Sequence, residues 1–138
     1  MALTHEKLDV YRLSIEYEAW VFAAAENLTG NFRHARDQWL RASQSIPLNV
    51  AEGNGKFAEA DRRRSFEIAQ GSALECAAIR DVLMVGNAMD EMAHRKGKDP
   101  LDRIVAMLTR MGGRSCSVRE EQASYLDSGS DSDTDTDA

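Results

Sequence analysis

Two spacings in the sequence place side chains where they could bind a metal or attack a substrate. Glu91-x-x-His94 is half of a di-iron helical-bundle site, which needs that pair on two helices and a carboxylate from each of two others. The sequence holds no second pair of this kind, so we predict no metal site. Ser43 and Ser45 lie close together, but no base stands near them in the sequence to activate a hydroxyl as a nucleophile. We therefore predict no hydrolase chemistry at these serines.

A glycine pattern and two cysteines are also weak indications of an activity. Gly53-x-Gly55-x-x-Ala58 matches a degenerate dinucleotide-binding fingerprint, which normally follows a strand and opens a helix. Here the preceding residues predict a helix, so the required context is missing. Cys76 and Cys116 lack the spacing of metal ligands, and we interpret them as unpaired thiols. We predict that the protein is not an enzyme and holds no cofactor.

Phosphate contact is the chemistry that remains, because residues 33–64 hold seven basic side chains against four acidic ones. Arg62, Arg63 and Arg64 are consecutive and would fan across more than half the circumference of a helix. Guanidinium groups bind phosphate oxygens in a bidentate manner, but acidic residues on the same helix could pair with these arginines instead. Both interpretations stay open. The candidate nucleic-acid contacts are Arg33, Arg36, Lys56, Arg62, Arg63 and Arg64.

The net charge of −6 is concentrated at the carboxyl end of the 138-residue chain. Residues 114–138 hold two basic side chains against seven acidic ones, so residues 1–113 carry a charge of only −1. The end of this tail is low in complexity and nearly free of apolar groups, so it cannot bury enough surface to offset its ordering entropy. We predict a helical domain at 1–113 and a disordered acidic tail at 114–138.

Apolar spacing and helix-stop residues predict four helices, at about residues 4–29, 32–52, 59–92 and 100–111. Thr4 is a suitable cap for the first, and Asp99 and Pro100 are suitable first residues for the last. No strand-like alternation is present. Four helices with short loops predict an all-α, up-and-down antiparallel four-helix bundle. The apolar runs are far shorter than the ~20 residues of a membrane span, and no export signal is visible, so we expect cytoplasmic residence.

The predicted first and third helices each have two apolar faces. One face of the first helix consists of Leu8, Tyr11, Ile15, Phe22 and Ala25, and the other of Val10, Leu13, Tyr17, Trp20 and Ala24. One face of the third helix consists of Ile68, Ala69, Cys76, Ile79 and Leu83, and the other of Leu74, Ala78, Val85, Met89 and Met92. A surface helix of a monomer needs one such face, so the second predicts contact with a partner subunit. The alternative is one wide core face. Gly71, within the third helix, predicts close approach by another helix.

The predicted second helix contains a proline. Pro47 removes a helical hydrogen bond at a cost of roughly 3 kcal/mol or more, so we expect a kink there. Nearby polar side chains such as Asn49 are expected to bond the freed backbone groups. Arg41 is expected to be buried against Glu52 or Glu75. The residues to which we assign structural roles are Gln38, Arg41, Ser45, Pro47, Asn49, Glu52, Gly53, Gly71 and Glu75.

Two longer motifs carry a family resemblance. The first is Gln38-x-x-Arg41-Ala42-x-x-Ser45-Ile46-x-x-Asn49-Val50-Ala51-Glu52-Gly53, and the second is Phe66-x-Ile68-Ala69-x-Gly71-Ser72-x-x-Glu75. With Leu8-x-Val10-Tyr11, they resemble the four-helix-bundle proteins encoded in intervening sequences of 23S rRNA genes. The accessory protein of diversity-generating retroelements belongs to the same broad family. The resemblance covers residues 8–111, but residues 31–34 and the acidic tail depart from the pattern.

The resemblance implies an up-and-down bundle, a homopentamer, association with RNA or RNA and DNA, and no enzymatic activity. Together with the basic residues, it predicts an oligomeric nucleic-acid-binding accessory protein, with RNA or single-stranded DNA as its ligand. The acidic body and tail favour a different class, a structural or protein-partner scaffold with no nucleic-acid role. A salt-titrated binding assay with structured RNA separates the two classes.

Overall fold

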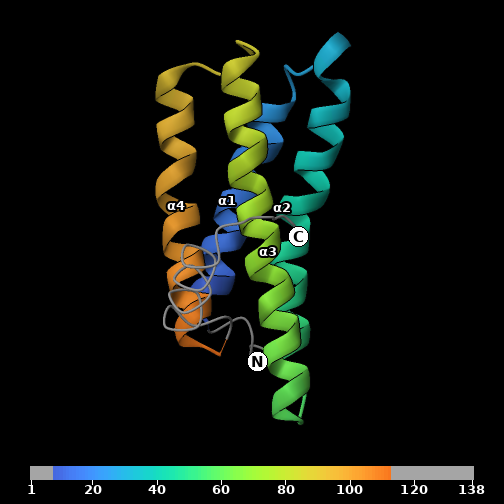
Figure 1. Cartoon of the computed structure of the whole chain (residues 1–138), viewed down its shortest axis with the longest axis vertical. Coiled ribbons are helices and arrows are strands. Elements are labelled where there is room, and N and C mark those ends of the chain that lie inside the picture. Colours follow the sequence, from blue (N-terminus) through green and yellow to red (C-terminus); the bar gives the residue numbers. More distant parts are fainter. Residues whose placement is uncertain (1–7, 113–138) are drawn as a thin grey trace, which may run out of the picture.

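The computed structural model describes residues 8–112, which form four helices and one short 3-10 turn. The helices are α1 (Asp9–Ala25), α2 (Arg33–Asn54), α3 (Glu59–Val85) and α4 (Glu91–Arg110), and the turn η2 is Gly30–Phe32. Consecutive helices run in opposite directions, and α4 packs back against α1 (Figure 1). The predicted all-α, up-and-down four-helix bundle is confirmed. The expected Thr4 cap and the acidic tail at 114–138 lie outside the described residues.

The core forms where helically spaced apolar residues of all four helices meet. Trp39 of α2 is fully buried, and its indole Nε1 donates a hydrogen bond to the Tyr17 hydroxyl of α1 at 3.1 Å. Trp20 packs edge-on against Trp39, with ring centroids 5.6 Å apart. A Cβ on Gly97 would lie 2.9 Å from the Trp20 ring, so this glycine lets α4 approach α1 closely. These aromatic contacts fix the level of α1, α2 and α4 relative to one another.

The boundary between α3 and α4 differs from the sequence prediction. The turn begins at Gly86, and Asn87 adopts a positive φ of 62° that ends α3 at Val85 instead of about 92. Asp90 then caps α4 by accepting a hydrogen bond from the Ala93 amide at 2.8 Å, so α4 begins at Glu91, nine residues before Pro100. Residues 93–99, which lie between the predicted third and fourth helices, are therefore helical, and Gly97 packs against the Trp20 ring. Met89 and Met92 therefore fall outside α3.

Within one chain, the surroundings of two glycines differ from those predicted. Gly53, expected to stop α2, lies inside it, where a Cβ would be 2.8 Å from the Phe66 ring and 2.9 Å from the Ser65 Cβ. Gly53 thus allows the close approach of α2 and α3, and α2 ends one residue later, at Asn54. Gly71, expected to allow a close approach, has no heavy atom of another described element within 4 Å of its Cβ position. Its open side faces outward.

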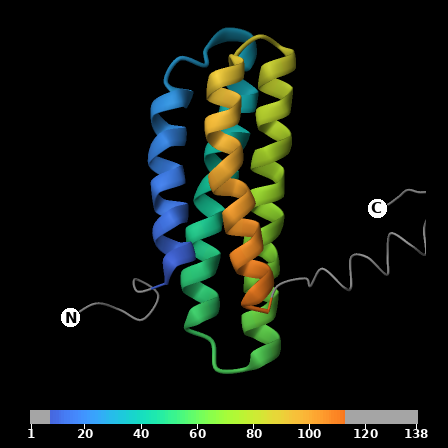
Figure 2. The same cartoon turned by 90° about the vertical axis from the view of Figure 1, so that its left-hand side faces the viewer.

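The connection between α2 and α3 extends beyond the rest of the bundle. The ends of these two helices project past the start of α1 and the end of α4 (Figure 2). Phe57 is fully exposed in the connection. We call this part, residues 52–64, the α2–α3 overhang. Its side chains meet one neighbouring helix rather than two.

Candidate functional site

A hydrogen-bonded cluster surrounds Pro47, which is buried within a continuous α2. The Asn49 amide donates to the Ser45 carbonyl at 2.8 Å and to the Ser45 hydroxyl at 3.0 Å. The Ser72 hydroxyl of α3 donates to the same Ser45 oxygen at 2.8 Å. The Ser43 hydroxyl donates to the Leu40 carbonyl at 3.0 Å. The Ser72–Ser45 hydrogen bond joins α2 to α3, but none of these bonds reaches the Ser43 carbonyl that Pro47 leaves without its helical donor, and none involves a histidine or a carboxylate.

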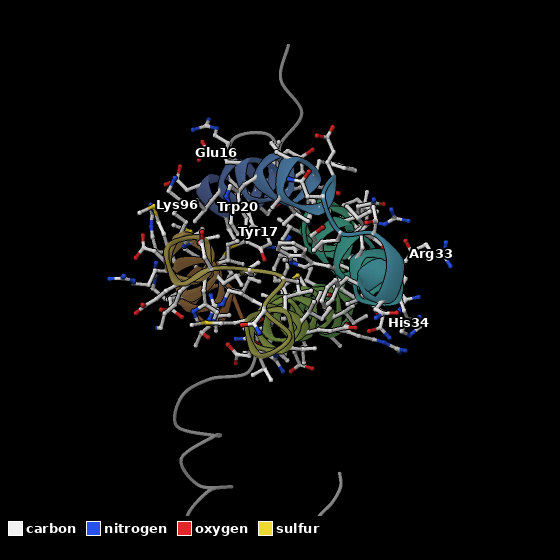
Figure 3. The ribbon with its side chains drawn as sticks, turned by 90° about the horizontal axis from the view of Figure 1, so that it is seen from above. Glu16, Tyr17, Trp20, Arg33, His34 and Lys96 are labelled. Atoms are coloured by element: carbon white, nitrogen blue, oxygen red, sulfur yellow. The ribbon has the colours of Figure 1, made fainter. Side chains whose placement is uncertain are left out.

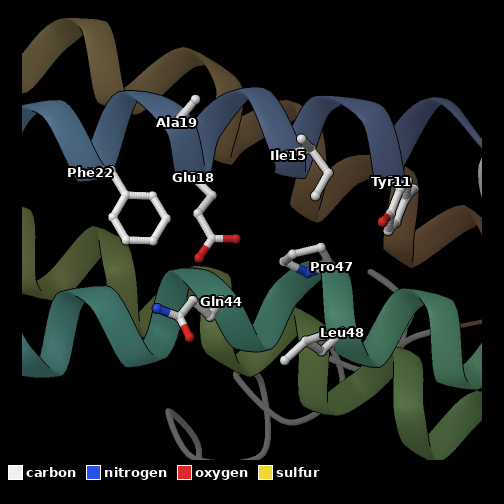
Figure 4. A pocket seen from close by; sticks show the side chains of 8 residues that line it. All are labelled: Tyr11, Ile15, Glu18, Ala19, Phe22, Gln44, Pro47 and Leu48. Carbon is white, nitrogen blue, oxygen red and sulfur yellow. The ribbon is translucent and has the colours of Figure 1, made fainter.

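An apolar groove of about 410 Å³ lies on the outer side of α1 and α2 (Figure 4). It is lined by Tyr11, Ile15, Glu18, Ala19 and Phe22 of α1 and by Gln44, Pro47 and Leu48 of α2. Ile15, Phe22 and Leu48 are 43%, 50% and 66% exposed. Ile15 and Phe22 therefore form a second apolar face of α1 outside the core, while Ala25, predicted to share that face, is buried. We call this feature the α1/α2 groove.

Glu18 is the carboxylate within the α1/α2 groove. Its side chain points toward Gln44 across the groove (Figure 4). Partial burial raises the pKa of this carboxyl above its ordinary value. Sequence reasoning missed Glu18, because it lies between apolar residues whose exposure only the fold reveals.

A second exposed apolar surface lies on α3. Ile68, Leu74, Val82 and Val85 are between 45% and 85% exposed, whereas the residues predicted to share a face with Ile68 are buried: Ala69, Cys76, Ile79 and Leu83. The small residues Gly71 and Ala78 are exposed between the four exposed apolar residues. We call these six exposed residues the α3 outer face. Of the predicted second face of this helix, Leu74, Ala78 and Val85 are exposed on α3, whereas Met89 and Met92 lie beyond its end.

The six predicted nucleic-acid contacts fall into two groups at opposite ends of α2. Arg33 and Arg36 lie in its first turn, and Figure 3 labels Arg33 beside His34 in the view from above. Lys56 and Arg62 to Arg64 lie in the α2–α3 overhang. At 1.5 Å per residue, the groups are about 30 Å apart along the helix. They do not form the single basic surface that their closeness in sequence suggested.

Most residues of the two groups have local partners. Three of them form ion pairs: Arg36 with Asp37 at 3.2 Å, Lys56 with Glu52 at 3.6 Å and Arg63 with Glu59 at 3.7 Å. Arg62 donates a hydrogen bond to the Asn54 carbonyl at 3.4 Å. Its guanidinium carbon lies 5.8 Å from the centre of the Phe66 ring. Arg64 makes no ion pair within residues 8–112 and borders a polar pocket of about 260 Å³ beside Asn49. Exposed ion pairs are worth at most about 1 kcal/mol, so phosphates could displace them.

Arg41 is exposed, which corrects the expectation that it is buried against Glu52 or Glu75. Glu52 pairs with Lys56 instead, and Glu75 is exposed on α3. No ion pair joins Arg41 to another described residue. The reason is its position on α2, because Arg41 shares an outer strip with Gln44 and Leu48 at helical spacing. This strip borders the α1/α2 groove.

A buried arginine was missed by sequence reasoning. Arg80 is only 5% exposed, and among the described residues its Nε and Nη1 have no hydrogen-bond partner. Its Nη2 lies 3.9 Å from Asp81, whose carboxylate is 2.7 Å from His94 Nε2. The sequence did contain a signal, because Arg80 follows Cys76 by four residues and precedes Leu83 by three on the buried face.

The metal-like spacing noted in the sequence joins different partners in the fold. His94 contacts Asp81 of α3, whereas Glu91 pairs with Arg95 at 3.7 Å. Within residues 8–112, no group of three or more His, Cys, Asp or Glu side chains is placed to hold a metal ion. No helix in the same range is long and apolar enough to cross a membrane.

Comparisons with known proteins agree with this geometry. A family model described as "23S rRNA-intervening sequence protein" matches residues 6–110. The chain belongs to this family. The motif residues of this 23S rRNA-intervening sequence protein divide by exposure: Ser45, Pro47 and Gly53 contact the bundle interior, whereas Arg41, Gly71 and Glu75 face outward. The inward group holds α2 against α3.

The bundle is also similar to a crystal structure of a protein of unknown function from the S23 ribosomal protein family of Bacteroides thetaiotaomicron VPI-5482. The TM-score is 0.70, and the similarity covers 75% of this chain and 97% of that chain. At 19% sequence identity, the similarity shows the fold alone. Curated proteins include no match to this sequence.

Proposed function

We propose that this 23S rRNA-intervening sequence protein is a cytoplasmic, non-enzymatic subunit that assembles with itself, as a pentamer, and binds nucleic acid. The observation that carries the assembly is the pair of exposed apolar surfaces, the α1/α2 groove and the α3 outer face. Apolar surfaces of this kind, in contact with water on a small domain, are typical of interaction sites. Light scattering, which measures the mass of the protein in solution, tests the assembly. A monomer mass at micromolar concentration would exclude it.

The family description supports RNA as the nucleic acid, with single-stranded DNA as the second candidate. The α2–α3 overhang is the surface we propose for phosphate contact. Lys56, Arg63 and Arg64 project from it, and the ion pairs that Lys56 and Arg63 form within the chain are exposed and weak. In a pentamer, five overhangs would repeat these cations around one assembly. Each phosphate neutralised adds about 0.7 to 0.9 to the slope of log affinity against log salt.

A pair of matched variants tests the phosphate surface with a structured RNA between about 50 and 200 mM salt. Replacing Lys56, Arg63 and Arg64 by alanine should weaken binding and flatten the salt dependence. Replacing Arg33 and Arg36 at the other end of α2 should change both less. Arg62 is left intact because it bonds the carboxyl end of α2. If the two sets of replacements lowered RNA affinity equally, the α2–α3 overhang would not be the specific phosphate-binding surface. If neither the unmodified protein nor any variant bound the RNA, the nucleic-acid role would be excluded.

A structural or protein-partner scaffold is the second candidate function. The observation that favours it is the pairing of Arg36, Lys56 and Arg63 with neighbouring carboxylates, which lowers the net positive charge of both ends. An assembled protein that binds no RNA or single-stranded DNA at about 50 mM salt would support the scaffold.

A further inference from the structure

The α1/α2 groove and the α3 outer face are complementary surfaces on different sides of one chain. The groove is a concave, apolar channel between two helices, and the outer face is a single helix with apolar side chains around Gly71 and Ala78. Both run along the bundle axis (Figures 1 and 4). A glycine with open space at its Cβ position lets a neighbouring helix come close. Each surface therefore has the shape that the other requires.

We propose that the α3 outer face of a second copy of this chain occupies the α1/α2 groove, with Arg41 of one copy opposite Glu75 of the next. The inference rests on the self-assembly proposed above and names its two surfaces and their register. Because the surfaces differ, the contact is heterologous, and repeating it builds a closed ring when the rotation between copies permits.

The register follows from contacts inside one chain. The Tyr17 hydroxyl meets Trp39 of α2 and the side chain of Cys76 of α3, so these three residues lie at one level of the bundle. Arg41 and Glu75 are within two residues of Trp39 and Cys76, which is about 3 Å along a helix axis. Two copies that stand side by side in the same orientation therefore bring these residues to the same height.

The charges agree with this register. Arg41 and Glu75 are both exposed, and within residues 8–112 neither takes part in an ion pair. Counting residues along each helix from the same level places Leu48 near the height of Ile68 and Phe22 near that of Val82. One apolar pair thus lies on each side of the charged pair. All four apolar side chains are at least 45% exposed in the single chain.

A two-fold contact between two grooves is the competing arrangement. It would bring the Glu18 carboxylates of both copies toward a shared axis, and like charges in a partly buried contact repel. In the heterologous contact, the acid that comes near the level of Glu18 is Glu75, and it lies opposite the Arg41 cation instead of opposite a second Glu18. The repulsion between Glu18 carboxylates therefore favours the heterologous contact over the two-fold one.

Cysteine cross-linking between two differently tagged full-length chains tests the pairing. Both carry Cys116→Ser, and one carries Phe22→Cys while the other carries Val82→Cys. Co-expression and oxidation should yield a disulfide-linked pair of unlike chains, and either chain expressed alone should yield none. Met92→Cys, which is equally accessible but lies on α4, replaces Val82→Cys as the matched control and should not cross-link.

Charge reversal supplies an independent readout by light scattering. Arg41→Glu and Glu75→Arg should each reduce the assembled mass at least twofold at a fixed micromolar concentration, and the double variant should restore it. Reversal of exposed Arg103 on α4 should leave the mass unchanged. A disulfide between two copies that both carry Phe22→Cys, or an oligomer that never forms the unlike pair, overturns the pairing while leaving self-assembly intact. A monomer in every sample overturns both.

Discussion

At the scale of single residues, Arg80 is a buried cation whose Nε and Nη1 lack hydrogen-bond partners in the described part of the chain. Burying a charge without well-placed partners is costly, and apolar replacements of such groups are often neutral or stabilising. Its aliphatic stem nevertheless packs near Gly97, where a Cβ would lie 3.3 Å from the Arg80 Cδ. The stem contributes packing between α3 and α4 that the charged end does not.

We predict that Arg80→Met keeps or raises the melting temperature, because methionine retains the apolar stem and removes the buried charge. Arg80→Ala should lower it, since the stem is lost as well. Differential scanning calorimetry at one protein concentration measures both. A large destabilisation by methionine would show that the guanidinium has a partner, such as bound water.

Cys76 is expected to be chemically inert in the folded protein. Burial, as the main cause, raises the pKa of its thiol to about 12, and only the thiolate reacts readily. In a Cys116→Ser background, Cys76 should react with a thiol reagent at pH 8 only as fast as the protein unfolds. Reaction followed with and without denaturant measures this. Rapid labelling of the folded chain would contradict the buried position.

Gly53 and Gly71 form a matched pair for mutation to alanine. Gly53→Ala should destabilise the fold by about 1–3 kcal/mol, because the new Cβ would overlap the Phe66 ring. In the unassembled chain, Gly71→Ala should stabilise α3 by up to about 1 kcal/mol, because alanine is the better helix former and no other described element lies within 4 Å of its Cβ. Urea denaturation gives both values, and the opposite order would contradict these glycine environments.

At the scale of helices, the sequence predicts the bundle better than its boundaries. The apolar spacing of α1 and α2 was sufficient to place both helices to within a few residues. Asp99 and Pro100 have the residue types of a helix start, but Asp90 and the positive φ of Asn87 provide the actual one. Local preference at Pro100 lost to tertiary packing, since Gly97 fits against Trp20 only if that stretch is helical.

The candidate sites show the same division. Residue spacing indicated a second apolar face on α1 and α3, because helical period alone decides which side chains share a face. Residue spacing did not reveal that the two groups of basic residues lie far apart, because they are at opposite ends of the long helix α2. Arg41 was misplaced because an arginine beside Ala42 looks buried until the neighbouring helix is placed.

We predict that Asp90→Ala lowers the stability of the bundle by about 0.5–2 kcal/mol, because the Ala93 amide loses its acceptor at the start of α4. Asp99→Ala serves as the control and should change stability little, since Asp99 is an exposed residue inside the helix. Chemical denaturation compares the two. A larger loss of stability from Asp99→Ala than from Asp90→Ala would indicate that α4 begins at Pro100, as the sequence predicted.

At the scale of the whole molecule, the distribution of charge determines the expected ligand. Deleting residues 114–138 changes the net charge from −6 to −1. We predict that this deletion raises affinity for RNA or single-stranded DNA, most at low salt, because a tethered acidic segment competes for the same cations. Replacing Lys56, Arg63 and Arg64 in the shortened chain should abolish the gain. An unchanged affinity after deletion would show that the tail does not compete.

The meeting of Trp20 with Trp39 has a consequence for optical measurements. These are the two tryptophans of the protein, so its indole emission comes entirely from the level where α1, α2 and α4 meet. The α2–α3 overhang contains none. Tryptophan emission during heating would therefore not change when the overhang frays. The far-ultraviolet circular dichroism signal would decrease, because helix is lost. Coincident curves would mean that the overhang melts with the bundle, and an earlier dichroism change would measure its independence.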